Sequence, residues 1–105
     1  MTMVKRSRPI SEANLTRWRE LDASQVLAAI AEHAKKDLTF VPVKDMSSSR
    51  WHASVGGVDY ELLLTGPRFW DCRSHVGGGG ALDLVMHLTR EEFKAAALRL
   101  MAASL

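Results

Sequence analysis

The stretch FWDCRSHVGGGGALDLVM, residues 69–86, decides the fold. An aromatic-rich segment at Arg68–Cys72 is β-prone, and four consecutive glycines follow at residues 77–80. Ala81–Leu88 then has the apolar spacing of an amphipathic helix. Glycines permit positive φ and lose much conformational freedom on folding, so a run of them interrupts a strand. The stretch therefore predicts a strand, a tight glycine turn that ends the sheet, and a helix that packs back on it.

Two further strands are predicted directly upstream. Residues 50–55 and 58–64 alternate in polarity, and the Gly-Gly pair at 56–57 is a turn favoured in hairpins. Together with the aromatic strand they form a three-stranded antiparallel meander. Residues 39–43 are β-prone but contain Pro42, so they form either a fourth, edge strand or a connection.

Helices are predicted before and after these strands in the chain, which gives an α+β fold with helices packed on one side of a small sheet. Ser11 caps a short helix that runs to Glu20, and a second helix begins at Asp22 or Ser24 and ends at Lys35-Lys36. A capping box at 89–92 starts the last helix. Its buried stripe consists of Phe93, Ala96, Ala97, Leu100 and Met101.

The length and composition predict one soluble domain. The 105 residues divide into a basic tail at 1–10 and a single module at 11–105. The tail, with Lys5, Arg6 and Arg8, is either a solvated extension or an arm that contacts phosphates. A net charge of +2 permits nucleic-acid binding without arguing for it.

Cysteine usage and hydropathy predict a cytoplasmic protein. The single cysteine cannot form an internal disulfide, which fits a reducing compartment. No apolar run has membrane-spanning length, and the N-terminus lacks the apolar core of a signal peptide. We therefore expect no association with a membrane.

The stretch at 69–88 resembles, without a gap, the second half of the CHC2-type zinc-binding domain of bacterial DNA primases. That family has an aromatic pair, Cys-x-x-Cys, a Gly-rich turn and a helix that opens like Ala81-Leu82-Asp83-Leu84. Here the second cysteine is His75. Relatives of this domain that lack zinc ligands have motifs similar to Trp51-His52 and Met86-His87-Leu88 as well, so the resemblance covers roughly residues 49–104. It implies a zinc-ribbon-like primase N-terminal fold and a role in replication or transfer of a plasmid or mobile element.

The resemblance also defines the candidate metal ligands, which are Cys72, His75 and His52. A structural zinc site needs four sulfur or nitrogen ligands. Cys72 and His75 keep the spacing of the family's second pair, whereas the first pair falls near Trp51 and Ser54. His52 is displaced by one residue. We therefore expect no zinc and no other cofactor.

No catalytic constellation is evident in the sequence. The lone cysteine has no recognisable base, and the Asp-x-Asp motif of Toprim catalytic domains, which commonly follow such modules, does not occur. We therefore expect a non-catalytic accessory domain rather than an enzyme.

The expected activity is binding of single-stranded DNA. Phe69 and Trp70 face opposite sides of their strand, so one is core and the other is either covered or available to stack on bases. The glycines either only turn the chain or expose amides that bind a phosphate. The candidate nucleic-acid-binding residues are Arg50, Trp51, Arg68, Trp70, Arg73, Gly77, Gly78 and Gly79.

A second function fits the same sequence. The module could dock on a primase, relaxase or helicase in replication or conjugation, or dimerise through its apolar helices. A basic sheet face favours DNA, and an uncharged apolar patch favours a protein partner. The oligomeric state does not follow from the sequence.

Overall fold

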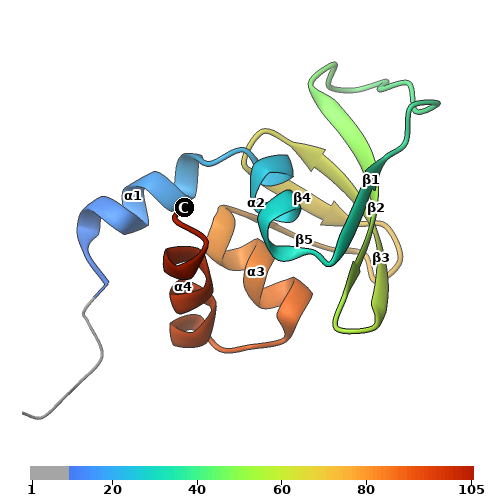
Figure 1. Ribbon diagram of the computed structural model, residues 1–105. Coiled ribbons are helices and arrows are strands. Elements are labelled where there is room, and N and C mark those ends of the chain that lie inside the picture. The colour runs from blue at the N-terminus through green and yellow to red at the C-terminus, as the bar shows by residue number, and fades with distance from the viewer. Residues whose placement is uncertain (1–9) are drawn as a thin grey trace, which may run out of the picture.

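One antiparallel sheet organises residues 10–105, the part of the chain that the computed structural model describes. Its five strands are hydrogen-bonded in chain order (Figure 1). They are β1 (His33–Lys36), β2 (Ser48–Val55), β3 (Val58–Thr65), β4 (Arg68–Asp71) and β5 (Val76–Gly79). The α+β class is confirmed, but the sheet has two strands more than the meander of three. Most of the predicted basic tail, residues 1–9, lies outside the described residues.

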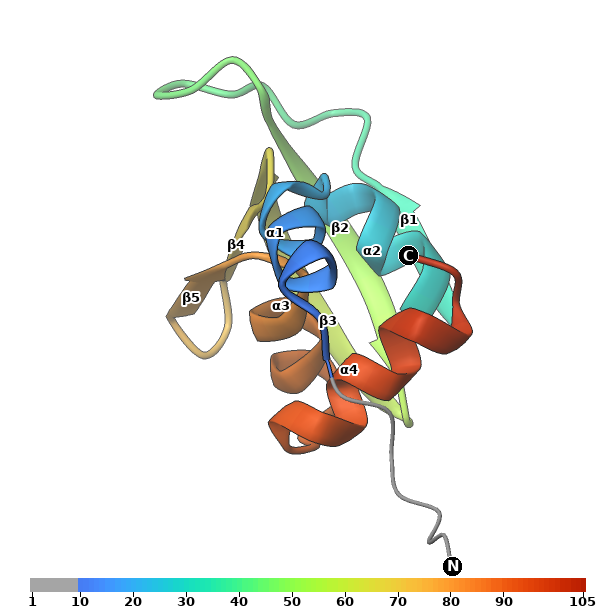
Figure 2. The same cartoon turned by 90° about the vertical axis from the view of Figure 1, so that its left-hand side faces the viewer.

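Four helices from the described residues lie together on one face of the sheet (Figures 1 and 2). They are α1 (Glu12–Glu20), α2 (Ala23–Ile30), α3 (Ala81–Thr89) and α4 (Phe93–Ala102). The predicted caps of the first two helices are present, since the side chain of Ser11 accepts from the amide of Asn14 and that of Asp22 from Ser24. The longest helix has ten residues, and none in this range is suited to crossing a bilayer.

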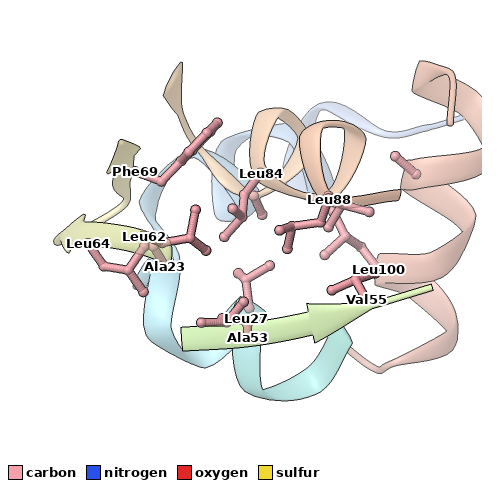
Figure 3. Close-up of a cluster of buried hydrophobic side chains, with 14 of the residues drawn as sticks. Ala23, Leu27, Ala53, Val55, Leu62, Leu64, Phe69, Leu84, Leu88 and Leu100 are labelled. Atoms are coloured by element: carbon pink, nitrogen blue, oxygen red, sulfur yellow. The ribbon is translucent and has the colours of Figure 1, made fainter. Parts of the chain in front are cut away.

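The hydrophobic core lies between the sheet and these helices (Figure 3). Alternation along β3 points Tyr60, Leu62 and Leu64 inward, as predicted. Leu27 of α2 and Leu84 of α3 have no exposed surface. Full burial of a leucine side chain contributes about 1.5–3 kcal/mol, so these contacts are the main stabilising interactions.

The second helix is shorter than predicted, and its expected last turn is a strand. It ends at Ile30, and the amide of Glu32 donates to the carbonyl of Ser54 over 2.9 Å. His33–Lys36 then pairs with β2, so His33 and both lysines belong to an edge strand and not to a helix. Pairing with β2 supplies backbone hydrogen bonds along one edge of this segment, and this tertiary contact overrides the helical spacing.

The hairpin of β2 and β3 follows the prediction closely. Gly56 and Gly57 both have positive φ, 57° and 81°, as a primed turn requires. The second strand begins at Ser48 rather than Arg50. Residues 39–43 form a connection and not a strand.

The glycine run extends the sheet where we predicted that it would end it. Val76–Gly79 pairs with β4 as the edge strand β5, and within the run only Gly80 has positive φ, at 97°. The aromatic side chains of β4 explain this outcome, because the Phe69 and Trp70 rings pack against Gly78 and Gly77. Packing by aromatic neighbours compensates for the low strand propensity of glycine.

The capping box predicted at 89–92 is also wrong. Thr89 is the last residue of α3, and its hydroxyl donates to the carbonyl of Val85 over 2.7 Å. The residue that precedes the first turn of α4 is Glu92, whose side chain makes no capping bond. Glu91 instead pairs with Arg99, eight residues further on. The two helices are separated by a short connection, which the capping pattern at 89–92 did not predict.

We expect Gly78→Val and Gly79→Val to differ sharply in stability. A Cβ at position 78 would lie 2.9 Å from Cε1 of Phe69 and 3.2 Å from Cβ of Asp83, whereas at 79 the nearest atom is Cγ of Arg68 at 3.7 Å. Overpacking should cost Gly78→Val about 1–3 kcal/mol. Gly79→Val should change stability by less than about 1 kcal/mol, because valine suits a strand. Urea unfolding measures both, and equal losses would contradict the packing argument.

Candidate nucleic-acid interface

One face of the sheet is not covered by any helix of residues 10–105, and we call it the open face (Figures 1 and 2). The strand register defines which side chains point there, because partners across an antiparallel pair share a face. They are His33, Lys35, Ser48, Arg50, His52, Ser54, Asp59, Glu61, Leu63, Thr65, Arg68 and Trp70, together with Gly77 and Gly79.

Trp70 is the large aromatic residue of the open face. It is 44% exposed, whereas Phe69 is 5% exposed and belongs to the core. The indole lies across Gly77, where a Cβ would be 2.8 Å from Cε3 of Trp70. The His75 ring stacks beside it, with centroids 6.2 Å apart and planes 13° from parallel. These two stacked rings form an aromatic surface near the β5 edge of the sheet.

A shallow hollow of about 410 Å³ adjoins this aromatic surface. Its lining includes the strand partners Thr65 and Arg68 and the partners Trp70 and Gly77. Its walls come from Leu63, Thr65, Arg68, Phe69, Trp70, Gly77 and Gly78. Trp70 and Arg68 are two residues apart on β4, so about 7 Å of strand separates an aromatic surface from a cation.

The charge of the open face is unevenly distributed. Glu61 forms an ion pair with Arg50, and its other carboxylate oxygen lies 3.7 Å from Nε of Arg73. These two arginines are therefore partly neutralised. Arg68 has no such ion pair within residues 10–105, although it contributes to lowering the pKa of Asp45, after larger contributions from hydrogen bonds with Ser47. Arg68 is therefore the cation of this surface most available to a phosphate.

The glycines of β5 make room for aromatic rings rather than offering amides to an anion. The carboxylate of Asp83 accepts the amide of Gly79 at 3.3 Å, at the start of α3. This carboxylate lies where an anion at the helix N-terminus would bind. Gly77 therefore makes room for Trp70 and Gly78 for Phe69, whereas no aromatic ring contacts the position of a Cβ at Gly79.

Trp51 lies on the opposite side of the sheet from Trp70. It shares the inner face with Ala53 and Val55, and it packs partly buried against the core. Its indole nitrogen donates to the hydroxyl of Ser49 over 2.8 Å. The structure thus groups Arg50, Arg68, Trp70 and Arg73 of the candidate set and leaves Trp51 outside that group.

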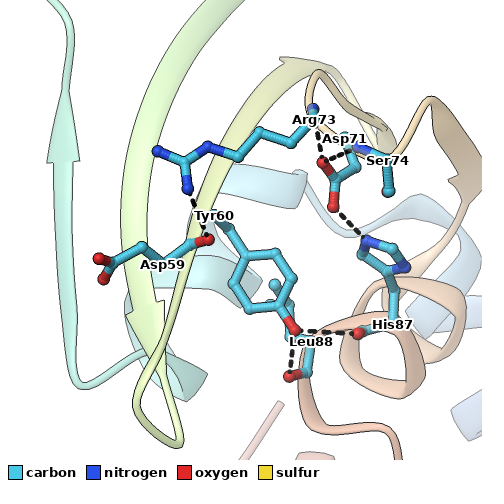
Figure 4. Close-up of polar contacts among 7 residues, drawn as sticks. All are labelled: Asp59, Tyr60, Asp71, Arg73, Ser74, His87 and Leu88. Atoms are coloured by element: carbon cyan, nitrogen blue, oxygen red, sulfur yellow. Dashed lines mark hydrogen bonds and ion pairs between the residues drawn. The ribbon is translucent and has the colours of Figure 1, made fainter.

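A nearly buried polar pair lies beneath the β4–β5 turn (Figure 4). Oδ2 of Asp71 is 2.6 Å from Nε2 of His87, and the side chains are 4% and 8% exposed. The other carboxylate oxygen accepts the amides of Arg73 and Ser74. Asp71 therefore shapes the turn that carries Arg73 and His75, and it ties that turn to α3.

Two opposing effects determine the pKa of Asp71. Burial raises it, but the hydrogen bonds from His87 and from the amides of Ser74 and Arg73 outweigh burial and lower the pKa to about 2. The carboxylate is therefore ionised and can only accept, so Nε2 of His87 carries the proton between them. Tyr60 packs edge-on against the imidazole and donates to the carbonyl of Leu88, which completes the cluster.

Sequence reasoning missed this cluster. Asp71 followed by Ser74 three residues later is a sequence signal for an Asx-type turn, and it could have indicated the role of Asp71 in that turn. The pairing with His87 could not be predicted from the sequence, because it depends on how α3 packs on the sheet. The position of His87 in a predicted helix leads us to expect a solvent-facing or hydrogen-bonded side chain, and His87 is hydrogen-bonded to Asp71.

The candidate metal ligands do not gather in one place. His75 stacks on Trp70, and His52 lies on β2 with the whole of β3 between it and the β4–β5 turn. No cluster of three or more histidine, cysteine, aspartate or glutamate side chains suited to a metal occurs among residues 10–105. Cys72 and His75 alone would be an incomplete ligand set.

Comparison with protein-family models, with curated proteins and with solved structures found no match to this chain. The site must therefore be interpreted from its own geometry.

Proposed function

We propose that the open face binds single-stranded DNA, as a non-catalytic, zinc-free module that serves replication or transfer of a plasmid or mobile element. The exposed indole of Trp70 on an uncovered sheet face carries this proposal. Bases stack on such aromatic side chains, and a nearby cation contacts the phosphates. The primase-like sequence at 69–88 supports DNA as the ligand, and the biological setting depends on that resemblance.

The shape of the face favours an unpaired strand over a duplex. Trp70 and His75 offer flat rings, and stacking on them requires bases that are not already stacked within a helix. A duplex would instead be read by an element that enters one of its grooves. The open face near Trp70 is a sheet surface flanked by β5, whose glycines have no side chains to insert into a groove.

Trp70→Ala is expected to weaken binding of a fluorescein-labelled oligothymidylate by about 1–3 kcal/mol, the usual contribution of one stacked base. Fluorescence anisotropy at low salt measures the affinity. Trp51→Phe is the matched control, because Trp51 lies on the inner face, and its affinity should equal that of the wild type. If the wild-type protein does not bind at low salt, or if Trp70→Ala binds as tightly while remaining folded, this proposal fails.

Arg68→Ala is expected to change the salt dependence of the same binding reaction. Removal of one phosphate contact should reduce the slope of log K against log salt by about 0.7 on a single strand. Arg19 on α1 is the matched control, since it is exposed on the helical side of the molecule and its removal should leave the slope unchanged. An unchanged slope in Arg68→Ala would remove Arg68 from the interface.

A further inference from the structure

The connection between β1 and β2, residues 37–47, stands out from the body of the molecule, and we call it the arm (Figures 1 and 2). It displays the most exposed large apolar side chains of residues 10–105. They are Leu38 (86% exposed), Val41 (74%), Val43 (90%) and Met46 (79%). A group of this kind is typical of an interaction site rather than of a free surface.

The arm is held in shape by two similar turns. The Asp37 carboxylate accepts the amide of Thr39 at 2.9 Å and its hydroxyl at 2.6 Å. The Asp45 carboxylate accepts the amide and hydroxyl of Ser47 at the same two distances. These Asx turns fix both ends of the arm. A segment ordered before binding loses less conformational entropy when a partner docks on it.

The two aspartates of the arm are held in the ionised form by hydrogen bonds within the protein. Hydrogen bonds from Thr39 lower the pKa of Asp37, with smaller contributions from Arg50 and His52, and hydrogen bonds from Ser47 together with Arg68 do the same for Asp45. Three lysines at or beside the arm form no ion pair with any of residues 10–105. They are Lys35, Lys36 and Lys44. Three lysines against two aspartates give residues 35–47 a net charge of +1, and the aspartate carboxylates are already hydrogen-bonded within the protein.

We propose that the arm binds an acidic, apolar segment of a partner protein. The apolar side chains supply buried area, and the three lysines complement carboxylates on the partner. This surface is separate from Trp70 and goes beyond the DNA-binding function.

Three other occupants fit the arm less well. Its four most exposed apolar side chains are not aromatic, and its one aromatic residue, Phe40, is partly buried, so the arm offers bases little to stack on. Insertion into a bilayer would carry Asp37 and Asp45 toward hydrocarbon, and no tryptophan or tyrosine lies in the arm to anchor it at a membrane interface. A second copy would bring lysines against lysines, which is unfavourable.

The test uses a fluorescent amphipathic peptide of about 20 residues, with leucine on one helical face and glutamate on the other. We expect saturable binding, weakened at least about tenfold in the double variant Val41→Ser/Val43→Ser. The matched control is Phe93→Ser/Leu98→Ser, which removes two half-exposed apolar side chains from α4 and should bind like the wild type. Trp70→Ala should also bind the peptide normally, so this result is independent of DNA binding.

Several outcomes would overturn the proposal. No binding up to about 1 mM peptide is one, and equal binding by the double variant is another. Equal affinity for a peptide with lysine in place of glutamate would show that charge complementarity does not contribute to binding. Arm-dependent binding to phosphatidylserine vesicles would assign the arm to membranes, and an arm-dependent dimer in sedimentation would assign it to a second copy. Leu38→Ser/Met46→Ser provides a second variant if the first does not fold.

Discussion

Asp71→Ala is expected to lower the free energy of unfolding by about 3–5 kcal/mol, because it removes one partner of a buried pair. The carboxylate accepts from His87, Arg73 and Ser74, so all three donors lose an acceptor at once. Hydrogen bonds to charged groups contribute more than neutral ones, about 1.5–3 kcal/mol each. Urea unfolding followed by circular dichroism measures the loss.

Asp59→Ala is the matched control for this prediction. Asp59 lies on the neighbouring strand β3, but it is exposed and its carboxylate bonds only to the hydroxyl of Ser54 among the side chains of residues 10–105. Its removal should cost no more than about 0.5 kcal/mol. A loss below about 1 kcal/mol in Asp71→Ala would mean that the carboxylate does not hold the turn.

The same pair links stability to the proposed DNA site. Asp71 orders the turn in which Arg73 and His75 lie, and His75 stacks on Trp70. A double-mutant cycle with His87→Ala separates the Asp71–His87 contact from the two amide contacts. We expect the two substitutions to be less than additive, since each removes the same hydrogen bond.

Local signals in the sequence predicted most of the helices and the central strands. Residues 50–55 and 58–64 alternate because one side of each strand meets the core, and the Gly-Gly turn between them adopts the positive φ values that it predicted. The caps at Ser11 and Asp22 form for the same reason: they depend on residues two or three positions away. Sequence patterns report such short-range interactions well.

The two outer strands could not be predicted, because they exist through contacts with their neighbours. Residues 33–36 have the composition of a helix end and become β1 because β2 pairs with them. Residues 77–79 are glycines with little intrinsic preference for a strand, and they belong to β5 because they pair with β4 and the aromatic side chains of β4 cover Gly77 and Gly78. Strand formation depends more on such context than helix formation does.

The residues of the candidate site could largely be predicted from the sequence, but their arrangement in space could not. Adjacency in β4 already required Phe69 and Trp70 to face opposite sides, and the register then assigns Trp70 to the open face. Trp51 and Arg50 are also adjacent in a strand and cannot share a face, although both were candidate nucleic-acid-binding residues. Glu61 pairs with two arginines because β2, β3 and the β4–β5 turn come together there. No local sequence pattern predicts such an arrangement.

Between pH 5 and pH 2 the wild-type protein is expected to lose about 2 kcal/mol more stability than Asp71→Asn, which has no carboxylate to titrate there. The pKa of Asp71 is lowered from 3.8 to about 2 in the folded chain, so the unfolded chain binds this proton first as the pH falls. The resulting stabilisation is fully present above the unfolded pKa and disappears as the pH falls through the folded one; one pKa unit corresponds to about 1.4 kcal/mol. Asp37, Asp45 and Glu91 also have lowered pKa values, but both proteins contain them, so they cancel in the difference. Urea unfolding at half-unit pH intervals gives the two curves, and parallel curves would show that Asp71 is not stabilised in its ionised form by His87 and the turn amides.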